Sequence, residues 1–264
     1  MKITTQTTEI LTNFASINPS ILVKPGSQLE TISAAKNILA RAGVSETFTQ
    51  QFGIFDVKQF VKVITSSIMK NAEIEFDEEY LTLVKDRSSL KYWYSDASTI
   101  IHPETELVMP EPEINFELEA DSLTSVLNIA KILKSTDLVL TSDGKTISLS
   151  VLDSMGTRRK RVPNPANTKK NIDVVAPYAD FSTPVGEGNG DTYVIFWKTQ
   201  NISKLAKGSY DVSISKQGIS HFSNQEIDLE YWITIEPNLE TEFKGEPVYE
   251  RNDEQNAWVN KYQV

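Results

Sequence analysis

The feature that most constrains the fold of this chain is a short helical pattern that recurs four times between strands. Apolar residues at helical spacing predict four amphipathic helices, at 5–17, 57–68, 122–134 and 201–207. A short strand is predicted before each helix, at 1–3, 52–55, 114–118 and 193–196. About three further strands follow each helix, so the chain is predicted to repeat a β-α-β-β-β unit four times, as an α+β protein with antiparallel sheets.

The strands after the helices are indicated by alternation and by turn residues. Ile227, Leu229, Tyr231, Ile233 and Ile235 alternate with mostly polar residues, as in a strand with one buried face. Hairpin turns are predicted at 77–79, 142–145 and 216–218, the second because Asp-Gly tolerates positive φ angles. The segment 29–44 is interpreted as strands despite its alanines. Asp121 is predicted to cap the third helix, and Gly208 to end the fourth.

The units pair into two halves. An Ile-Phe pair before the second helix recurs before the fourth, and Trp93 recurs as Trp232, both roughly 140 residues apart, which favours a duplication. Prolines and acids predict an extended connector between the halves. The predicted organisation is a first domain 1–103, a connector 104–112, a second domain 113–237 and a polar C-terminal tail or docked extension 238–264. Residues 163–190 are predicted to form a long loop.

Basic residues are segregated on the predicted helices, although the net charge of the chain is −10. The faces opposite the apolar stripes, with the residues flanking the fourth helix, carry seven lysines: Lys58, Lys62, Lys131, Lys134, Lys198, Lys204 and Lys207. Most acids fall on strands and connectors. If the helices share one surface, it is positive and suited to sequence-independent contact with phosphates. The first helix carries no lysine.

The most basic stretch of the sequence is Arg158-Arg159-Lys160-Arg161, followed by Lys169-Lys170. Two interpretations remain open for it. It is either an additional contact for DNA or a partner, or a solvated loop.

Residues for catalysis, metal binding or cofactor binding are not evident. The chain has no cysteine and two histidines, His102 and His221, neither in a nucleophile or metal-ligand motif. The glycines at 186–190 lack the Lys-Ser/Thr of a phosphate-binding loop. We therefore expect no enzyme, no cofactor and no metal. No apolar stretch long enough for a membrane span or a signal peptide is present.

Several segments resemble the sliding clamps of T-even-type bacteriophages. They are Thr7–Asn18, Ile54–Val57, Asp96–Thr99 and Leu118–Leu123, and the resemblance extends over roughly residues 1–236 by the order and spacing of these segments. It implies two similar domains and a head-to-tail homotrimer, with helices lining a ring and antiparallel sheets outside. The seven lysines would then face duplex DNA without reading its sequence.

The resemblance also implies the partners and the cellular location. Expected partners are a DNA polymerase, an ATP-dependent clamp loader and late-transcription factors, in the cytoplasm of an infected bacterium. A pocket for partner peptides is expected near the connector and the last strands, at Leu107, Val108, Met109, Ile235 and Pro237. The loop 163–190 and the tail after Pro237 exceed the family pattern.

Two other classes of protein stay open from the residues alone. A β-rich phage virion structural protein would explain an acidic, cysteine-free chain, but not helices with basic faces. An enzyme of an unrecognised type would require a catalytic cluster that the sequence does not display.

Overall fold

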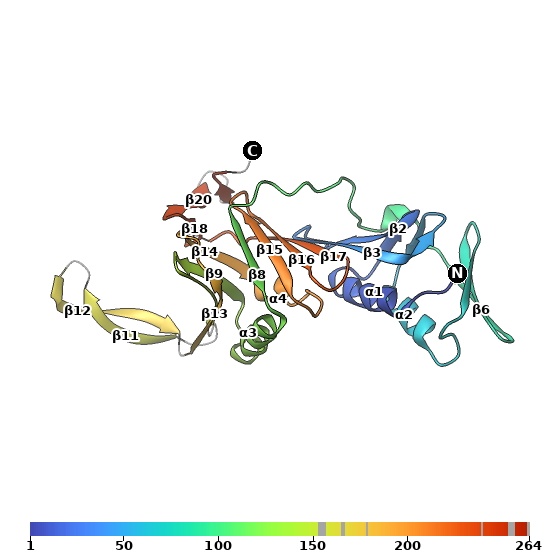
Figure 1. The fold of residues 1–264 in the computed structure, drawn as a ribbon, viewed down its shortest axis with the longest axis horizontal. Helices are drawn as coiled ribbons and strands as arrows, with labels where there is room; N and C mark the ends of the chain where they lie inside the picture. Colours follow the sequence, from blue (N-terminus) through green and yellow to red (C-terminus); the bar gives the residue numbers. More distant parts are fainter. Residues whose placement is uncertain (153–156, 165–166, 178, 239, 253–256, 263–264) are drawn as a thin grey trace. The chain divides into compact units, whose positions relative to one another are not determined.

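A computed structural model describes residues 1–152, 157–164, 167–177, 179–238, 240–252 and 257–262 (Figure 1). By their contacts these residues form two compact units. Unit 1 consists of Met1–Met109, Lys204–Ala206 and His221–Ile233. Unit 2 consists of Pro110–Ser203, Lys207–Ser220 and Thr234–Val264. The first boundary between the two units along the chain, Met109–Pro110, lies inside the segment 104–112 that was predicted as a connector.

Unit 1 contains the first two repeats of helix and strands. Its elements are α1 (Thr5–Ile17), β1 (Ile21–Val23), β2 (Gly26–Ile32), β3 (Ile38–Phe48), β4 (Phe52–Ile54), α2 (Val57–Thr65), β5 (Glu73–Phe76), β6 (Tyr80–Lys85), β7 (Ser88–Trp93), the 3₁₀ turn η1 (Ala97–Thr99) and most of β17 (Leu229–Thr234). All of the following pairs are antiparallel: β1 with β4, β2 with β3, β3 with β17, and β6 with both β5 and β7. The segment predicted as strands at 29–44 is confirmed.

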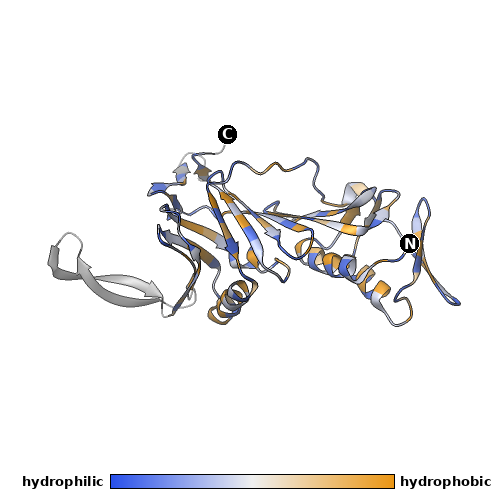
Figure 2. Cartoon of the chain, in the orientation of Figure 1, coloured by the Kyte–Doolittle hydropathy of each residue, from blue (hydrophilic) through white to orange (hydrophobic). Residues whose placement is uncertain are grey.

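The core of unit 1 comes from the predicted apolar stripes. Ile10, Leu11 and Phe14 of α1 are each at most 3% exposed, and α1 contacts α2, β2 and β3. Figure 2 shows hydrophobic and hydrophilic residues alternating around the helices. Burying each large apolar side chain contributes about 1.5–3 kcal/mol, so this stripe fixes which face of the helix meets solvent.

Unit 2 contains the third repeat and the first part of the fourth, whose later strands lie mostly in unit 1. Its elements are β8 (Ile114–Leu118), α3 (Ala120–Leu133), β9 (Asp137–Asp143), β10 (Thr146–Leu152), β11 (Thr157–Asn164), β12 (Asn167–Pro177), β13 (Asp180–Glu187), β14 (Thr192–Lys198), α4 (Thr199–Ile202), β15 (Tyr210–Ser215), the start of β16 (Ile219–Asn224), β18 (Glu242–Phe243), β19 (Glu246–Pro247), β20 (Tyr249–Asn252) and β21 (Ala257–Asn260). One sheet has the strand order β13-β10-β9-β14-β18-β19. Helix α3 packs on β10 and β13 of this sheet.

The three predicted turns are confirmed, and the helix ends differ in detail. Residues 1–3 form no strand, so the first repeat begins with its helix. Asp121 lies in the first turn of α3 and is not its N-cap, which is Glu119. Asp121 still suits the positive end of the helix dipole. The fourth helix is only four residues long and ends before Lys204.

The long loop predicted at 163–190 is wrong. Most of the segment is strand: β11 pairs with β12 as a two-stranded ribbon, and β13 pairs with β10. The loop was predicted from the prolines in this segment. Proline is excluded from central strands but is tolerated in edge strands. Pro184 lies in β13, an edge strand, and Pro163 lies in a ribbon whose two strands are both edges. Irregular backbone remains at 188–191.

The C-terminal segment is docked on unit 2. Strand β18 adds to the edge of β14, and Val248 and Tyr249 are buried, at 0% and 6% exposure. The amide of Lys261 donates to the carbonyl of Val248 at 3.0 Å, and Asn260 Nδ2 donates to the carbonyl of Lys216 at 3.0 Å. The segment therefore belongs to the folded unit.

The substitution Val248→Ala tests this docking. Losing two buried methyl groups and leaving a cavity should lower the free energy of unfolding by about 2 kcal/mol, measured by urea unfolding. The matched control is Val108→Ala, because Val108 is 80% exposed, and it should change stability by less than about 0.5 kcal/mol. Equal effects of the two substitutions would show that the C-terminal segment does not pack as described.

Candidate nucleic-acid interface

The lysines of α2 lie on its solvent face. Val57, Phe60 and Ile64 are buried, whereas Lys58 and Lys62 are exposed. They are four residues apart and therefore share one face. Asp56 caps the helix: its carboxylate accepts a hydrogen bond from the backbone amide of Gln59 at 2.9 Å. The acid thus stabilises the start of the helix, while the two lysines point away from the core.

The lysines of α3 border a groove. Lys131 and Lys134 are exposed, and Lys134 ends the helix in a left-handed conformation with φ of 52°. A groove of about 750 Å³ separates the C-terminal half of α3 from α4 and the end of β14. Its polar lining comes from both sides: Asn128, Lys131, Lys134, Ser135, Thr136, Lys198, Thr199, Gln200 and Ser203. The groove is thus basic and rich in hydrogen-bonding groups.

Lys198 lies in this groove but is paired with acids. Its Nζ is 2.9 Å from Asp137 Oδ1 and 3.2 Å from Glu236 Oε1. The hydrogen bond to Asp137, assisted by Glu236, outweighs partial burial and raises the pKa of Lys198 above its ordinary value. The side chain is therefore a cation under all ordinary conditions, and its charge is largely balanced by its two neighbours.

Lys204 is held beside α1, which has no lysine of its own. Asn13 Nδ2, on α1, donates to the backbone carbonyl of Lys204 at 2.7 Å. Tyr231 links Asn13 to the segment that follows Lys204: its hydroxyl donates to Asn13 Oδ1 at 2.8 Å and accepts from the amide of Ala206 at 3.1 Å. Asn13 and Lys204 are 191 residues apart, so no local pattern of residues indicated this contact. Lys207 follows as an exposed residue of unit 2.

The N-terminus of α1 is anchored by a buried carboxylate that the sequence analysis missed. Glu46, on β3, is 5% exposed and accepts hydrogen bonds from the amide of Thr4 and the hydroxyl of Thr7. Burial by itself raises the pKa of Glu46, but these hydrogen bonds together outweigh it, so the pKa lies below its ordinary value of 4.5. The charge also faces the positive end of the helix dipole. An acid at a strand position, far from α1 in sequence, offered no local signal.

The other predicted site residues lie in different places. Arg158, Arg159, Lys160 and Arg161 lie on β11, of which the backbone is described. In unit 1, Val108 is exposed, and Leu107 and Met109 are half-buried. In unit 2, Ile235 is buried, at 2% exposure, and Pro237 is exposed. The peptide pocket stays a prediction, in which Ile235 can act only as a supporting residue.

Both histidines contact neighbouring groups of the fold. His221 stacks on Trp232, with ring centroids 4.8 Å apart, and burial lowers its pKa although Glu230 lies 3.4 Å away. His102 Nδ1 is 2.9 Å from the carbonyl oxygen of Ile100. Among the described residues, no group of three or more His, Asp or Glu side chains is arranged to hold a metal ion. The described helices include none with the length and apolar character needed to cross a membrane.

Comparisons with known proteins agree with this fold. Residues 3–102 match the DNA polymerase processivity factor family. The chain is 27% identical to the sliding clamp of Vibrio phage KVP40, over 89% of this chain and 99% of that clamp. It is 24% identical to the sliding clamp of Enterobacteria phage T4, over 92% of this chain and 100% of that clamp. The PCNA of A. fulgidus, solved with the C-terminal region of FEN-1, superimposes with a TM-score of 0.62 at 10% identity, over 88% and 95% of the two chains.

The fold and these matches together define the class of the protein. Two similar halves of antiparallel sheets, each with a few short helices, are the architecture of the DNA clamps. Within that class, the chain is similar to the sliding clamps of T-even-type phages. The predicted α+β clamp fold and the resemblance are confirmed. The interpretation as a virion structural protein has no support among the matches.

The role of Glu46 can be tested by pH. Glu46→Gln should lower the free energy of unfolding at pH 7 by about 1–3 kcal/mol, because it weakens buried charge-assisted hydrogen bonds. Since folding depresses the pKa of Glu46, its stabilising effect is complete above the ordinary pKa of 4.5 and is lost as the pH falls through the folded-state value. Urea unfolding should therefore give wild-type and variant curves that converge in acid. Glu9→Gln, on the exposed face of the same helix, should have little effect, and a pH-independent loss in Glu46→Gln would contradict the assignment.

Proposed function

We propose that the protein forms a closed head-to-tail ring of three chains around duplex DNA and tethers the replicative DNA polymerase. A heterologous interface that closes after a fixed number of copies yields a ring. Its relatives are sliding clamps of phages. Tethering by encirclement needs only weak contacts with the DNA, because it raises the effective concentration of the polymerase at the primer end.

The observation that carries the proposal is the exposed lysine face of α2 and α3 in an otherwise acidic chain. Lys58, Lys62, Lys131 and Lys134 are exposed on helix faces opposite buried apolar stripes. Lysine is a flexible point charge, and contacts of this kind with phosphates carry no sequence information. We assign these four residues, together with Lys204 and Lys207, to the DNA-facing surface. Lys198 contributes mainly by organising the groove, because Asp137 and Glu236 balance its charge.

The tether requires partners on the ring. We infer that a polymerase, an ATP-dependent loader and late-transcription proteins bind it, and that it acts inside the infected bacterial cell. The PCNA of A. fulgidus was solved with the C-terminal region of FEN-1, which supports peptide capture as the mode of binding. Our candidates for such contacts are exposed Val108 with half-buried Leu107 and Met109 in unit 1 and, separately, exposed Pro237 in unit 2. The role is one of binding, and we assign no catalytic residue.

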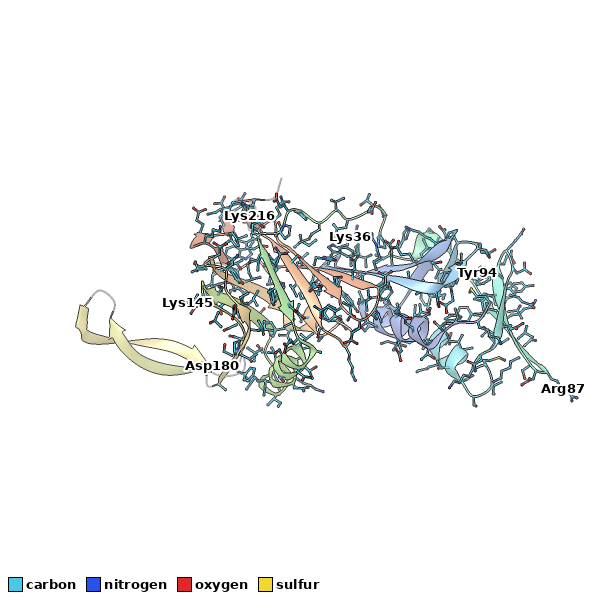
Figure 3. The ribbon with its side chains drawn as sticks, in the orientation of Figure 1. Lys36, Arg87, Tyr94, Lys145, Asp180 and Lys216 are labelled. Carbon is cyan, nitrogen blue, oxygen red and sulfur yellow. The ribbon has the colours of Figure 1, made fainter. Side chains whose placement is uncertain are left out.

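Charge reversal on α3 tests the DNA-facing assignment. Lys131→Glu with Lys134→Glu should shorten loader-dependent primer extension by at least about tenfold, because repulsion replaces attraction to phosphates. The fold should remain intact by circular dichroism, since both side chains are exposed. The matched control reverses two exposed lysines in turns, Lys36→Glu and Lys145→Glu (labelled in Figure 3), and should leave extension unchanged. Unchanged extension by the α3 variant would remove these lysines from the assignment.

The mass in solution tests the ring itself. Light scattering over a dilution series should give about three times the 29.7 kDa of one chain, falling toward a single chain at low concentration because association follows mass action. A strict monomer at high concentration would contradict the closed ring.

A further inference from the structure

The β11–β12 ribbon prolongs a hairpin of the main sheet of unit 2. The last pair of β10 and β13 is Leu152 with Asp180, and the first pair of the ribbon is Thr157 with Pro177. Asp180, labelled in Figure 3, is the first residue of β13 and follows Pro177, the last residue of β12, by three positions. The eight residues of β11 correspond to a length of about 25 Å at the usual rise per residue of a strand. In the part of the chain that the structure describes, β11 and β12 pair only with each other.

The ribbon concentrates basic residues on an acidic protein. Between residues 157 and 177 it holds six of the 26 lysines and arginines of the chain, against one acid, Asp173. The net charge of the whole chain is −10. A positive segment on an acidic chain is suited to an anionic partner.

The register distributes these charges over both faces of the ribbon. Successive residues of a strand alternate between faces, so the positions of Arg158 and Lys160 lie on one face and those of Arg159 and Arg161 on the other. On the first face, the cross-strand partners of Arg158 and Lys160 are Ala176 and Val174. On the second face, those of Arg159 and Arg161 are Val175 and Asp173. Neither face is acidic overall, and both carry basic positions along their length.

We propose that the β11–β12 ribbon is an arm that binds duplex DNA by inserting between phosphate backbones, without encircling the duplex. The inference rests on the proposed function for the identity of its ligand, and adds a contact outside the helix lysines. The major groove of B-form DNA is about 12 Å wide and admits a two-stranded ribbon. A ribbon in a groove has phosphates on both sides, which suits basic positions on both faces. A flat acidic protein surface, such as that of a second copy of the chain, would contact only one face of the ribbon. Because the register places basic positions on both faces, it favours DNA as the partner.

The test separates the arm from the ring by using DNA that cannot be threaded. Filter binding would measure the affinity of the full-length protein for relaxed, covalently closed circular duplex, without loader or ATP, at a series of salt concentrations. Wild type should bind with an affinity that falls steeply as salt increases, because each phosphate contact releases counterions.

Two ribbon variants and one control define the result. Replacing Arg158, Arg159, Lys160 and Arg161 by glutamine should lower the affinity at low salt at least about tenfold and reduce the salt slope by about 3–4. Lys169→Gln with Lys170→Gln is a milder variant, expected to reduce the slope by about 2. A control that removes four lysines elsewhere, Lys36, Lys70, Lys85 and Lys145, by the same replacement should match wild type. Thermal unfolding should be the same in all variants.

The outcomes distinguish this inference from the proposed function. No binding to closed circles by wild type, or equal binding by ribbon variants and wild type, would overturn the arm. A ribbon variant that keeps its DNA affinity but loses mass in light scattering would show that the ribbon joins copies of the chain, which also overturns it. Loader-dependent primer extension reports on the ring separately, so a wild type that supports extension without binding circles would lose the arm alone. Binding to circles without extension would support the arm and contradict the tether.

Discussion

The packing of each helix on its sheet is the constraint on which the rest of the structure depends. Once Ile10, Leu11 and Phe14 of α1 are buried, and α3 is seated on β10 and β13, one face of each helix is committed to the core. The opposite face must meet solvent. In α2 and α3 this face carries lysine. A basic surface on an acidic chain is thus a consequence of apolar packing, and the charges themselves do little to hold the fold together.

Acids in this protein organise structure where they meet the helices. Glu46 holds the start of α1, Asp56 caps α2, and Asp137 with Glu236 balances Lys198. Each carboxylate accepts from backbone donors at the start of a helix or pairs with a nearby cation. The remaining acids lie mainly on strands and turns.

The C-terminal segment and the β11–β12 ribbon are two additions to the sheet of unit 2, and they differ in kind. The C-terminal segment extends one end of the sheet through β18 and buries Val248. The β11–β12 ribbon prolongs the hairpin at the other end and pairs with itself. The first addition gains stability from apolar burial, whereas the second carries charge in a two-stranded element that has little core of its own.

The sequence by itself determined the repeats, the turns and the segregation of lysine, because periodicity of apolar residues is a local property. It failed at residues 163–190, since proline in an edge strand and proline in a loop give the same local signal. Only the tertiary structure decided that Lys204 lies beside α1, that Lys198 is paired, that Glu46 anchors a helix and that Val248 is buried. These contacts join residues far apart in sequence, such as Asn13 and Lys204, 191 positions apart. They form only when the sheets bring distant strands together.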